Sequence, residues 1–168
     1  MKILSALQFR EADSYTIKHE KITSLTLMER AGKACFEWLQ SKKDVSKKYL
    51  VICGNGNNGG DGLVISRLLA EKKQLYEVII LSVGNPSPDF YTNFEKIKSL
   101  NIPVKELKEG DNLSLADDVI VIDAIFGTGL NRPVNGWIGQ CLDAINARVS
   151  EVIAIDLPSG LFADMHTV

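Results

Sequence analysis

Several features that would assign a function class directly are missing from this sequence. The three cysteines are an odd number and form no C-x-x-C pair, so neither a disulfide framework nor a zinc site is indicated. No apolar run is long enough to span a bilayer or to form the core of an export signal. The formal net charge of −2 gives no electrostatic reason to expect nucleic acid or an anionic membrane as a partner. We therefore expect a cytoplasmic protein with reduced thiols.

The chain has the composition of a globular protein, with 168 residues of which 45% are apolar and 24% charged. That length is sufficient for one domain with a sizeable core. Short runs rich in β-branched residues alternate with helical patterns, which is typical of an α/β fold whose parallel sheet is covered on both faces. The strand-like runs are residues 49–53, 76–83, 103–107, 118–123 and 151–156.

Two helices are predicted before the first strand. Ser5 with Gln8, and Thr26 with Glu29, have the spacing of capping boxes. The second of these helices carries an apolar stripe with a period near 3.6 residues, which we assign to the core. The stripe consists of Leu27, Met28, Ala31, Ala34, Cys35, Trp38 and Leu39.

A glycine-rich loop, "CGNGNNGGDG" at residues 53–62, separates the first predicted strand from a helix. Gly54, Gly56 and Gly59 form a G-x-G-x-x-G pattern, in which glycines permit positive φ and let phosphate oxygens approach backbone N–H groups. The next strand ends "ILSVGN", without an acidic residue for a ribose hydroxyl, and no Lys-Ser/Thr pair follows the glycines. An ordinary NAD dehydrogenase and a Walker loop are therefore not indicated. Cys53 borders this loop, but a buried structural thiol is a better interpretation than a nucleophile.

Oxygen-bearing side chains follow three of the predicted strands at their carboxyl ends. Asn57, Asn58 and Asp61 lie in the glycine-rich loop, Asp123 precedes a second glycine loop, and Asp156 precedes a Pro-Ser-Gly turn. Each of these residues alone could be a helix cap or a turn residue. Because the carboxyl ends of parallel strands meet at one edge of a sheet, all three groups together predict a ligand-binding crevice there.

Three motifs in this order resemble the YjeF N-terminal domain, the family of NAD(P)HX epimerases. They are "GNGNNGGDG", "DAIFGTGLNRPVNG" and "AIDLPSG", preceded by "LMERAG", and the resemblance runs from about Leu27 to Asp164. It implies a Rossmann-like three-layer α/β/α sandwich with a mainly parallel sheet and, in this chain, an N-terminal helical extension. Domains of this family continue past "PSGLxAD", so we interpret residues 1–168 as a single domain that is incomplete at its C-terminal end.

The resemblance also implies an activity. Such epimerases interconvert the R and S forms of hydrated NADH and NADPH, damaged cofactors that carry a hydroxyl on the nicotinamide ring. A dehydratase that uses ADP or ATP then restores the S form, and in bacteria it is commonly fused to the epimerase. The chain is thus expected to bind NAD(P)HX and to supply a dehydratase domain or protein, and its activity as a shortened chain is an open question.

By the same resemblance, Asn58, Asp123 and Ser159 would hold a potassium ion. Oxygen donors suit a hard cation, although this rule does not choose potassium over sodium or calcium. The hydrated dinucleotide would be contacted by two loops and by the aspartate of the third motif. These residues are Asn57, Asn58, Gly59, Gly60, Asp61, Gly127, Thr128, Gly129, Leu130, Asn131, Arg132, Pro133 and Asp156.

Epimerisation needs a general acid–base group, and three carboxylates are candidates. Asp123 is assigned to the cation, and Asp61 is expected to open a helix whose dipole lowers its basicity. Asp156, which is followed by Leu157, is expected to be partly desolvated, so that its pKa rises toward neutrality. We therefore predict Asp156 as the general base and acid.

A non-catalytic scaffold that binds a nucleotide, RNA or protein partner is the alternative function. A scaffold has little use for the whole set Asn58, Asp123, Asp156 and Ser159, so their joint presence favours the enzyme. The sequence leaves the preference between NADHX and NADPHX open. The apolar N-terminal helices offer a face for a homodimer.

Overall fold

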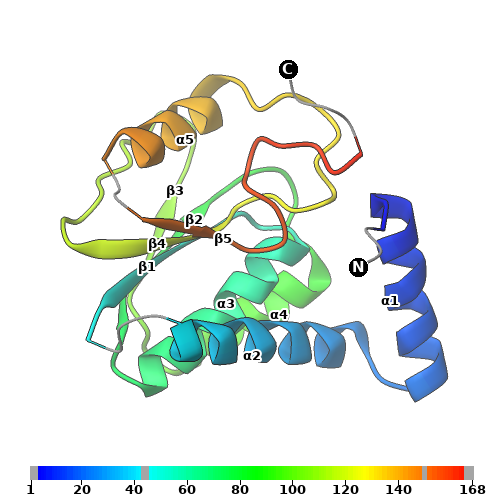
Figure 1. Cartoon of the computed structure of the whole chain (residues 1–168). Coiled ribbons are helices and arrows are strands. Elements are labelled where there is room, and N and C mark those ends of the chain that lie inside the picture. The colour runs from blue at the N-terminus through cyan, green and yellow to red at the C-terminus, as the bar shows by residue number, and fades with distance from the viewer. Residues whose placement is uncertain (1–3, 43–45, 149–150, 165–168) are drawn as a thin grey trace.

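The structure is a computed structural model that describes residues 4–42, 46–148 and 151–164. Within these ranges one sheet contains five strands, and every pair of neighbouring strands is parallel (Figure 1). The strands lie in the order β3-β2-β1-β4-β5. Their bounds are β1 (Lys48–Cys53), β2 (Leu75–Leu81), β3 (Val104–Leu107), β4 (Val119–Ala124) and β5 (Val152–Ala154). The predicted α/β fold with a parallel sheet is confirmed.

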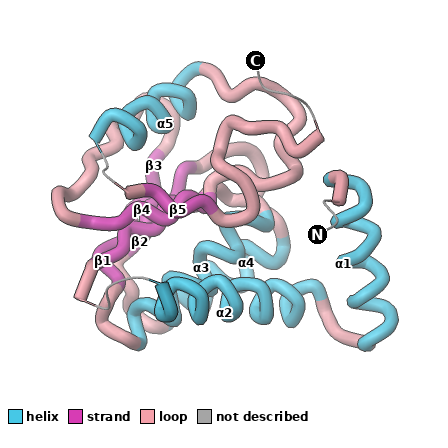
Figure 2. The backbone as a smooth tube through the Cα atoms, viewed as in Figure 1, coloured by secondary structure: helices cyan, strands magenta, loops and turns pink. Residues whose placement is uncertain are grey.

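Helices cover both faces of this sheet, which gives the predicted three layers (Figure 2). The helices are α1 (Ala6–Glu20), α2 (Ser24–Lys42), α3 (Asn57–Glu71), α4 (Pro88–Ser99) and α5 (Gly136–Arg148). Apolar side chains of α2, α3 and α4 pack in one cluster, and those of α5 pack in the other. Strand and helix alternate from β1 to β3 and again from β4 to β5, whereas β4 follows β3 without an intervening helix in the described residues 108–118.

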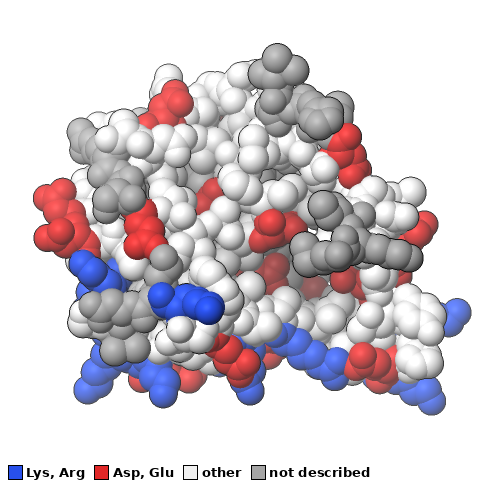
Figure 3. Space-filling view, viewed as in Figure 1, with Lys and Arg blue, Asp and Glu red and all other residues white. Residues whose placement is uncertain are grey.

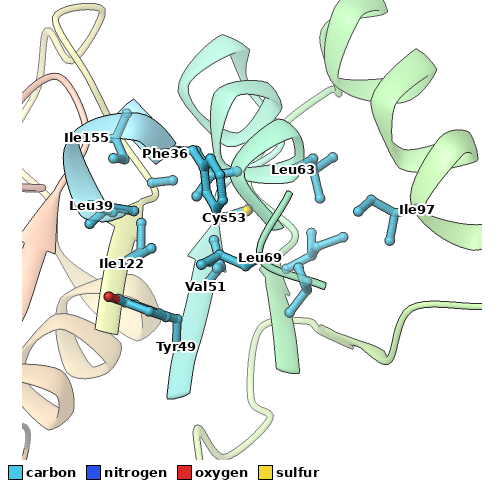
Figure 4. Packing of buried hydrophobic residues seen from close by; sticks show 14 of the residues in the cluster. Phe36, Leu39, Tyr49, Val51, Cys53, Leu63, Leu69, Ile97, Ile122 and Ile155 are labelled. Atoms are coloured by element: carbon cyan, nitrogen blue, oxygen red, sulfur yellow. The ribbon is translucent and has the colours of Figure 1, made fainter. Parts of the chain in front are cut away.

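Strand β1 shows why a continuous apolar run belongs in the centre of this sheet. Tyr49, Val51 and Cys53 point toward the α2–α3–α4 layer (Figure 4), whereas Leu50 and Ile52 pack on the α5 side. All five are at most 1% exposed. Burial of each large apolar side chain contributes about 1.5–3 kcal/mol, so the two faces of one strand stabilise both outer layers.

The two N-terminal helices start differently. Ser5 caps α1 with both bonds of the predicted box, because its Oγ accepts from Gln8 N (3.2 Å) and its N–H donates to Gln8 Oε1 (2.9 Å). The box predicted at Thr26 is wrong, since α2 already begins at Ser24. Thr23 Oγ1 instead accepts from the N–H of Thr26 (3.1 Å).

The apolar stripe predicted on α2 is only partly correct. Met28 and Leu39 are buried, but Trp38 is 49% exposed, and Ala31 and Ala34 are exposed as well. The buried row is rotated toward Gly32 and Phe36 because α2 packs closely on α3. A Cβ at position 32 would lie 2.6 Å from Val64 Cγ1, so the glycine itself makes the contact.

Helix α1 forms the predicted N-terminal extension and lies near the loops that follow the carboxyl ends of the strands (Figure 1). Along its length Ala6 alone is buried, while Leu7 is 58% and Tyr15 is 66% exposed. Its first N–H donates to the Asp164 carboxylate (3.0 and 3.3 Å), which ties α1 to the segment after β5. Among the described residues, no helix combines the length and apolar character needed to cross a bilayer.

Candidate functional site

A cleft of about 700 Å³ lies at the carboxyl edge of the sheet, where the predicted crevice was placed. The loops after β1 and β4 and the segment after β5 line it, so the three motifs come together. Figure 3 shows acidic side chains around a recess on this face. The predicted residues in its wall are Asn57, Asn58, Asp61, Gly127, Thr128, Gly129, Leu130, Asn131, Arg132 and Asp156.

Most glycines of the first loop are required by packing and not by backbone conformation. A Cβ at Gly59 would overlap the carbonyl oxygen of Gly54, and a Cβ at Gly54 would overlap the carbonyl oxygen of Ile125. None of the glycines at residues 54–62 has positive φ, so that part of the expectation is wrong. Gly59 and Gly60 therefore lie behind the cleft wall, whereas Gly56 has open space around its Cα and faces the cleft.

Helix α3 begins at the cleft. Its N-cap is Gly56, which has no side chain to bond the first N–H groups. Those donors, together with the positive end of the helix dipole, suit an anionic group such as a phosphate. Arg10 and Arg132 are the cationic side chains among the residues that line the cleft.

Asp123 and Ser159 form one hydrogen-bonded unit. Ser159 donates its N–H to Asp123 Oδ2 (2.8 Å) and its Oγ–H to Asp123 Oδ1 (2.6 Å). Ile125 N also donates to Asp123 Oδ1 (3.1 Å), and Ser159 Oγ accepts from Phe126 N (2.9 Å). Asp123 is 6% exposed and belongs to no ion pair with a described residue. The unit joins the segments that follow β4 and β5.

The side chain of Asn58 is buried beside this cleft without a hydrogen bond to any described residue. Both its Oδ1 and its Nδ2 lack a partner. An unsatisfied buried polar group costs about 1–3 kcal/mol, so such a group at a cleft points to a ligand. No three His, Cys, Asp or Glu side chains are grouped for a metal in the described ranges. A cation here would therefore take amide and hydroxyl oxygens beside the single carboxylate of Asp123.

Asp156 connects the segment after β5 to the loop after β4. Its Oδ2 accepts from Thr128 N (2.6 Å), and its backbone has a φ of 66°, in the left-handed region. Gly127 must be a glycine because a Cβ there would overlap Asp156 Oδ2. The side chain is exposed to the cleft, so the expected desolvation of Asp156 by Leu157 is wrong.

Asp61 is the cleft carboxylate that burial perturbs. Burial first, and then the neighbouring charges of Asp156, Asp13 and Asp89, together raise its pKa to about 7. The expectation that Asp61 opens the helix is wrong, because α3 begins at Asn57 and Asp61 lies in the second turn. Desolvation outweighs the helix dipole there, since the dipole effect falls off within the first turn.

The cysteines behave as structural thiols. Cys53 is fully buried, and burial first, then the charges of Asp123 and Asp61, raises the pKa of its thiol. A raised pKa disfavours the thiolate that a nucleophile requires. All three cysteines are free; Cys53 and Cys141 are buried, and Cys35 is partly buried.

Sequence reasoning missed the contribution of α1 to the site. Phe9, Arg10 and Asp13 line the cleft, although α2 and β1 separate them in the sequence from the glycine-rich loop. Their spacing of one to four residues places them on one side of a helix, which is the only local signal. Nothing in that pattern indicates that this side meets the carboxyl edge of the sheet.

Comparisons with known proteins agree with the geometry. The model of the family described as "YjeF-related protein N-terminus" matches residues 24–168. A Lentilactobacillus buchneri protein named NAD(P)H-hydrate epimerase is 42% identical over 95% of this chain and 73% of its own length. A Limosilactobacillus fermentum protein of the same name is 38% identical over 98% of this chain and 78% of its own length. The crystal structure of yeast YNL200c superposes with a TM-score of 0.70 at 24% identity, covering 95% of this chain and 72% of the yeast chain, which supports the fold.

Proposed function

The chain belongs to the YjeF-related N-terminal family, and on this premise we propose that it is an NAD(P)H-hydrate epimerase, which interconverts the R and S forms of hydrated NADH and NADPH. Relatives that share 38–42% of its residues over nearly its whole length carry that name. The observation that carries the proposal is the convergence of all three motifs on one cleft. A cleft of about 700 Å³ is within the usual size range of a ligand pocket.

We infer that the dinucleotide lies with its phosphates toward the start of α3. The uncapped N–H groups after Gly56 and the guanidinium groups of Arg10 and Arg132 are the complementary donors. The nicotinamide end would then reach the side of the cleft that Asp156 and Thr128 form. Gly56 and Gly129 have open space around them, which lets a ligand approach the backbone.

The residues present fit a potassium ion held by Asn58, Asp123 and Ser159. An ion there would satisfy Asn58 Oδ1, which has no partner among the described residues, and would offset the buried charge of Asp123. When bound, the ion supplies a fixed positive charge beside the phosphate-binding end of the cleft. Ser159 retains one lone pair for it, because its hydroxyl accepts a single hydrogen bond from Phe126 N.

We propose Asp156 as the proton acceptor of the reaction. The hydrated carbon is next to the ring nitrogen, so inversion requires its C–O bond, or the adjacent C–N bond, to break and form again. Either route moves a proton on and off oxygen. Thr128 N donates to Asp156 Oδ2, which orients the carboxylate, and exposure to the cleft leaves the group accessible to the substrate.

A chiral-resolved assay of R-to-S conversion tests the function. The chain should convert purified R-NADPHX to the equilibrium mixture, and an ADP- or ATP-dependent dehydratase should then consume the S form as it is produced. Loss of conversion in Asp156→Asn would support the assigned role. A scaffold would show neither conversion nor a rise in melting temperature on addition of NADP, and that pair of results would reject the enzyme.

A further inference from the structure

Three carboxylates from three separate elements face the cleft. Asp13 comes from α1, Asp61 from α3 and Asp156 from the segment after β5. Asp13 and Asp156 are exposed, whereas Asp61 is partly buried. The three groups therefore share one ligand space but differ in how much water reaches them.

Asp61 has no compensating partner in the described part of the chain. Its surroundings supply burial and negative charge and no hydrogen bond or ion pair that would stabilise its anion. Asp156 and Asp13 line the same cleft and act on it through their charges, as does Asp89 at the start of α4. Cys35 and Cys53 also lie close enough for its charge to raise their pKa values. Arg10 is on the cleft wall without a described ion pair to Asp61.

These surroundings favour the protonated form of Asp61. A pKa of about 7 keeps Asp61 largely protonated just below neutrality, and the negative charge of Asp156 contributes to that shift. Two titratable groups whose environments push them apart are the usual arrangement for a paired acid and base. A carboxyl without a protein partner can present its proton to a ligand.

We propose that Asp61 is a second catalytic residue, the proton donor to the hydroxyl of the bound hydrated nicotinamide, and that it acts opposite Asp156. This inference rests on the proposed epimerase function. It adds a role that neither the motif resemblance nor the relatives' names assign to this residue.

The proposed reaction proceeds by loss of water from one face of the ring carbon and its return to the other face. The Asp61 carboxyl transfers its proton to the substrate hydroxyl, the C–O bond breaks with its electron pair on oxygen, and water leaves. The lone pair of the ring nitrogen forms a C=N bond to the same carbon. Water then attacks that carbon from the other face, the C=N π pair returns to nitrogen, and the excess proton passes to Asp156. Exchange of a proton with solvent returns Asp61 to the acid form and Asp156 to the base form.

The first test needs no substrate. A carboxyl with a pKa near 3.9 in the unfolded chain and about 7 in the fold binds more protons when folded. The contribution of Asp61 to the free energy of unfolding is therefore fully present below about pH 4 and is lost as the pH rises to about 7. Denaturant titration should show the unfolding constant rising by up to about tenfold per pH unit in this window. Asp61→Asn should remove that rise, and the exposed Asp117→Asn control should keep it. An unchanged slope in Asp61→Asn would overturn the proposal.

The second test separates this inference from the proposed function. In the parent enzyme, kcat should fall above pH 7 as Asp61 loses its proton. Asp61→Asn should lower kcat by about 10²–10⁴-fold with KM changed only a few-fold, and Asp61→Glu should recover part of the rate. An active parent whose Asp61→Asn variant keeps kcat, or loses only KM, overturns the donor role. A parent that converts no NADPHX overturns the proposed function itself.

Discussion

The two walls of the cleft are built in different ways. The wall formed by the loop after β1 and the start of α3 is packed so closely that Gly59 has no room for a methyl group against the carbonyl oxygen of Gly54. The opposite wall, formed by the loop after β4, is exposed around Gly129 and is joined to the segment after β5 through the bond from Thr128 N to Asp156. We infer that the first wall fixes the position of the ligand and that the second presents reactive groups to it.

The largest effect is expected in the packed wall. Gly59→Ala would push a Cβ into the Gly54 carbonyl oxygen, so the loop and α3 must separate. We expect it to lower the free energy of unfolding by about 3 kcal/mol or more, at the upper end for overpacked cores. Gly129→Ala, which meets open space, should stay within about 0.5 kcal/mol of the parent. Denaturant titration of both variants checks this difference, and equal effects would show that the two walls are packed alike.

Substitution in the exposed wall should act on rate and not on stability. Asp156→Asn keeps an oxygen that can accept from Thr128 N, so the loop should hold its position. The epimerisation rate should nevertheless fall by about 10²–10⁴-fold, because the amide cannot accept a proton at neutral pH. A chiral-resolved assay measures the rate, and circular dichroism with a melting curve is the control. A variant that melts far below the parent would mean that Asp156 is mainly structural.

The proposed potassium site takes Asn58 from the start of α3 and the Asp123–Ser159 pair from the segments after β4 and β5. Potassium chloride should raise the melting temperature relative to choline chloride at the same ionic strength, with a stabilisation of about 2.7 kcal/mol at 100 times the dissociation constant. Asn58→Ala should abolish the potassium-dependent rise. Without potassium it should cost little, because it removes a side chain whose amide is already unsatisfied. A rise retained in Asn58→Ala would place the ion elsewhere.

The smallest effect is expected from α1, which lines the cleft but packs little against the sheet. Arg10→Ala should raise the KM for NADPHX several-fold, as expected for one exposed charge–phosphate contact of about 0.5–1 kcal/mol. Stability should be unchanged, because Arg10 is exposed. Lys18→Ala, an exposed change on the same helix and not in the cleft wall, is the matched control and should leave the KM unchanged. A higher KM in both variants would indicate a general effect of charge.

Much of the fold follows from short-range patterns in the sequence. The β-branched run of β1 predicts a strand buried on both faces, and Ser5 with Gln8 predicts the start of α1. The meeting of the segments after β4 and β5, which Asp123 and Asp156 join by hydrogen bonds, follows as well, since parallel strands place their carboxyl ends at one edge. The cap at Thr26 was wrong because Thr23, three residues earlier, offers the same hydroxyl and lies where the chain leaves its turn.

What the sequence determined by itself is the set of strands, their parallel direction and the chemical groups at their ends, because these depend on periodicity and on residue type. Tertiary structure alone decided which face of α2 is buried, that α1 lines one side of the cleft, and that burial raises the pKa of Asp61. Each of these depends on contacts between segments far apart in the chain. Desolvation in particular is set by how much of the molecule surrounds a group, and no local pattern records that quantity.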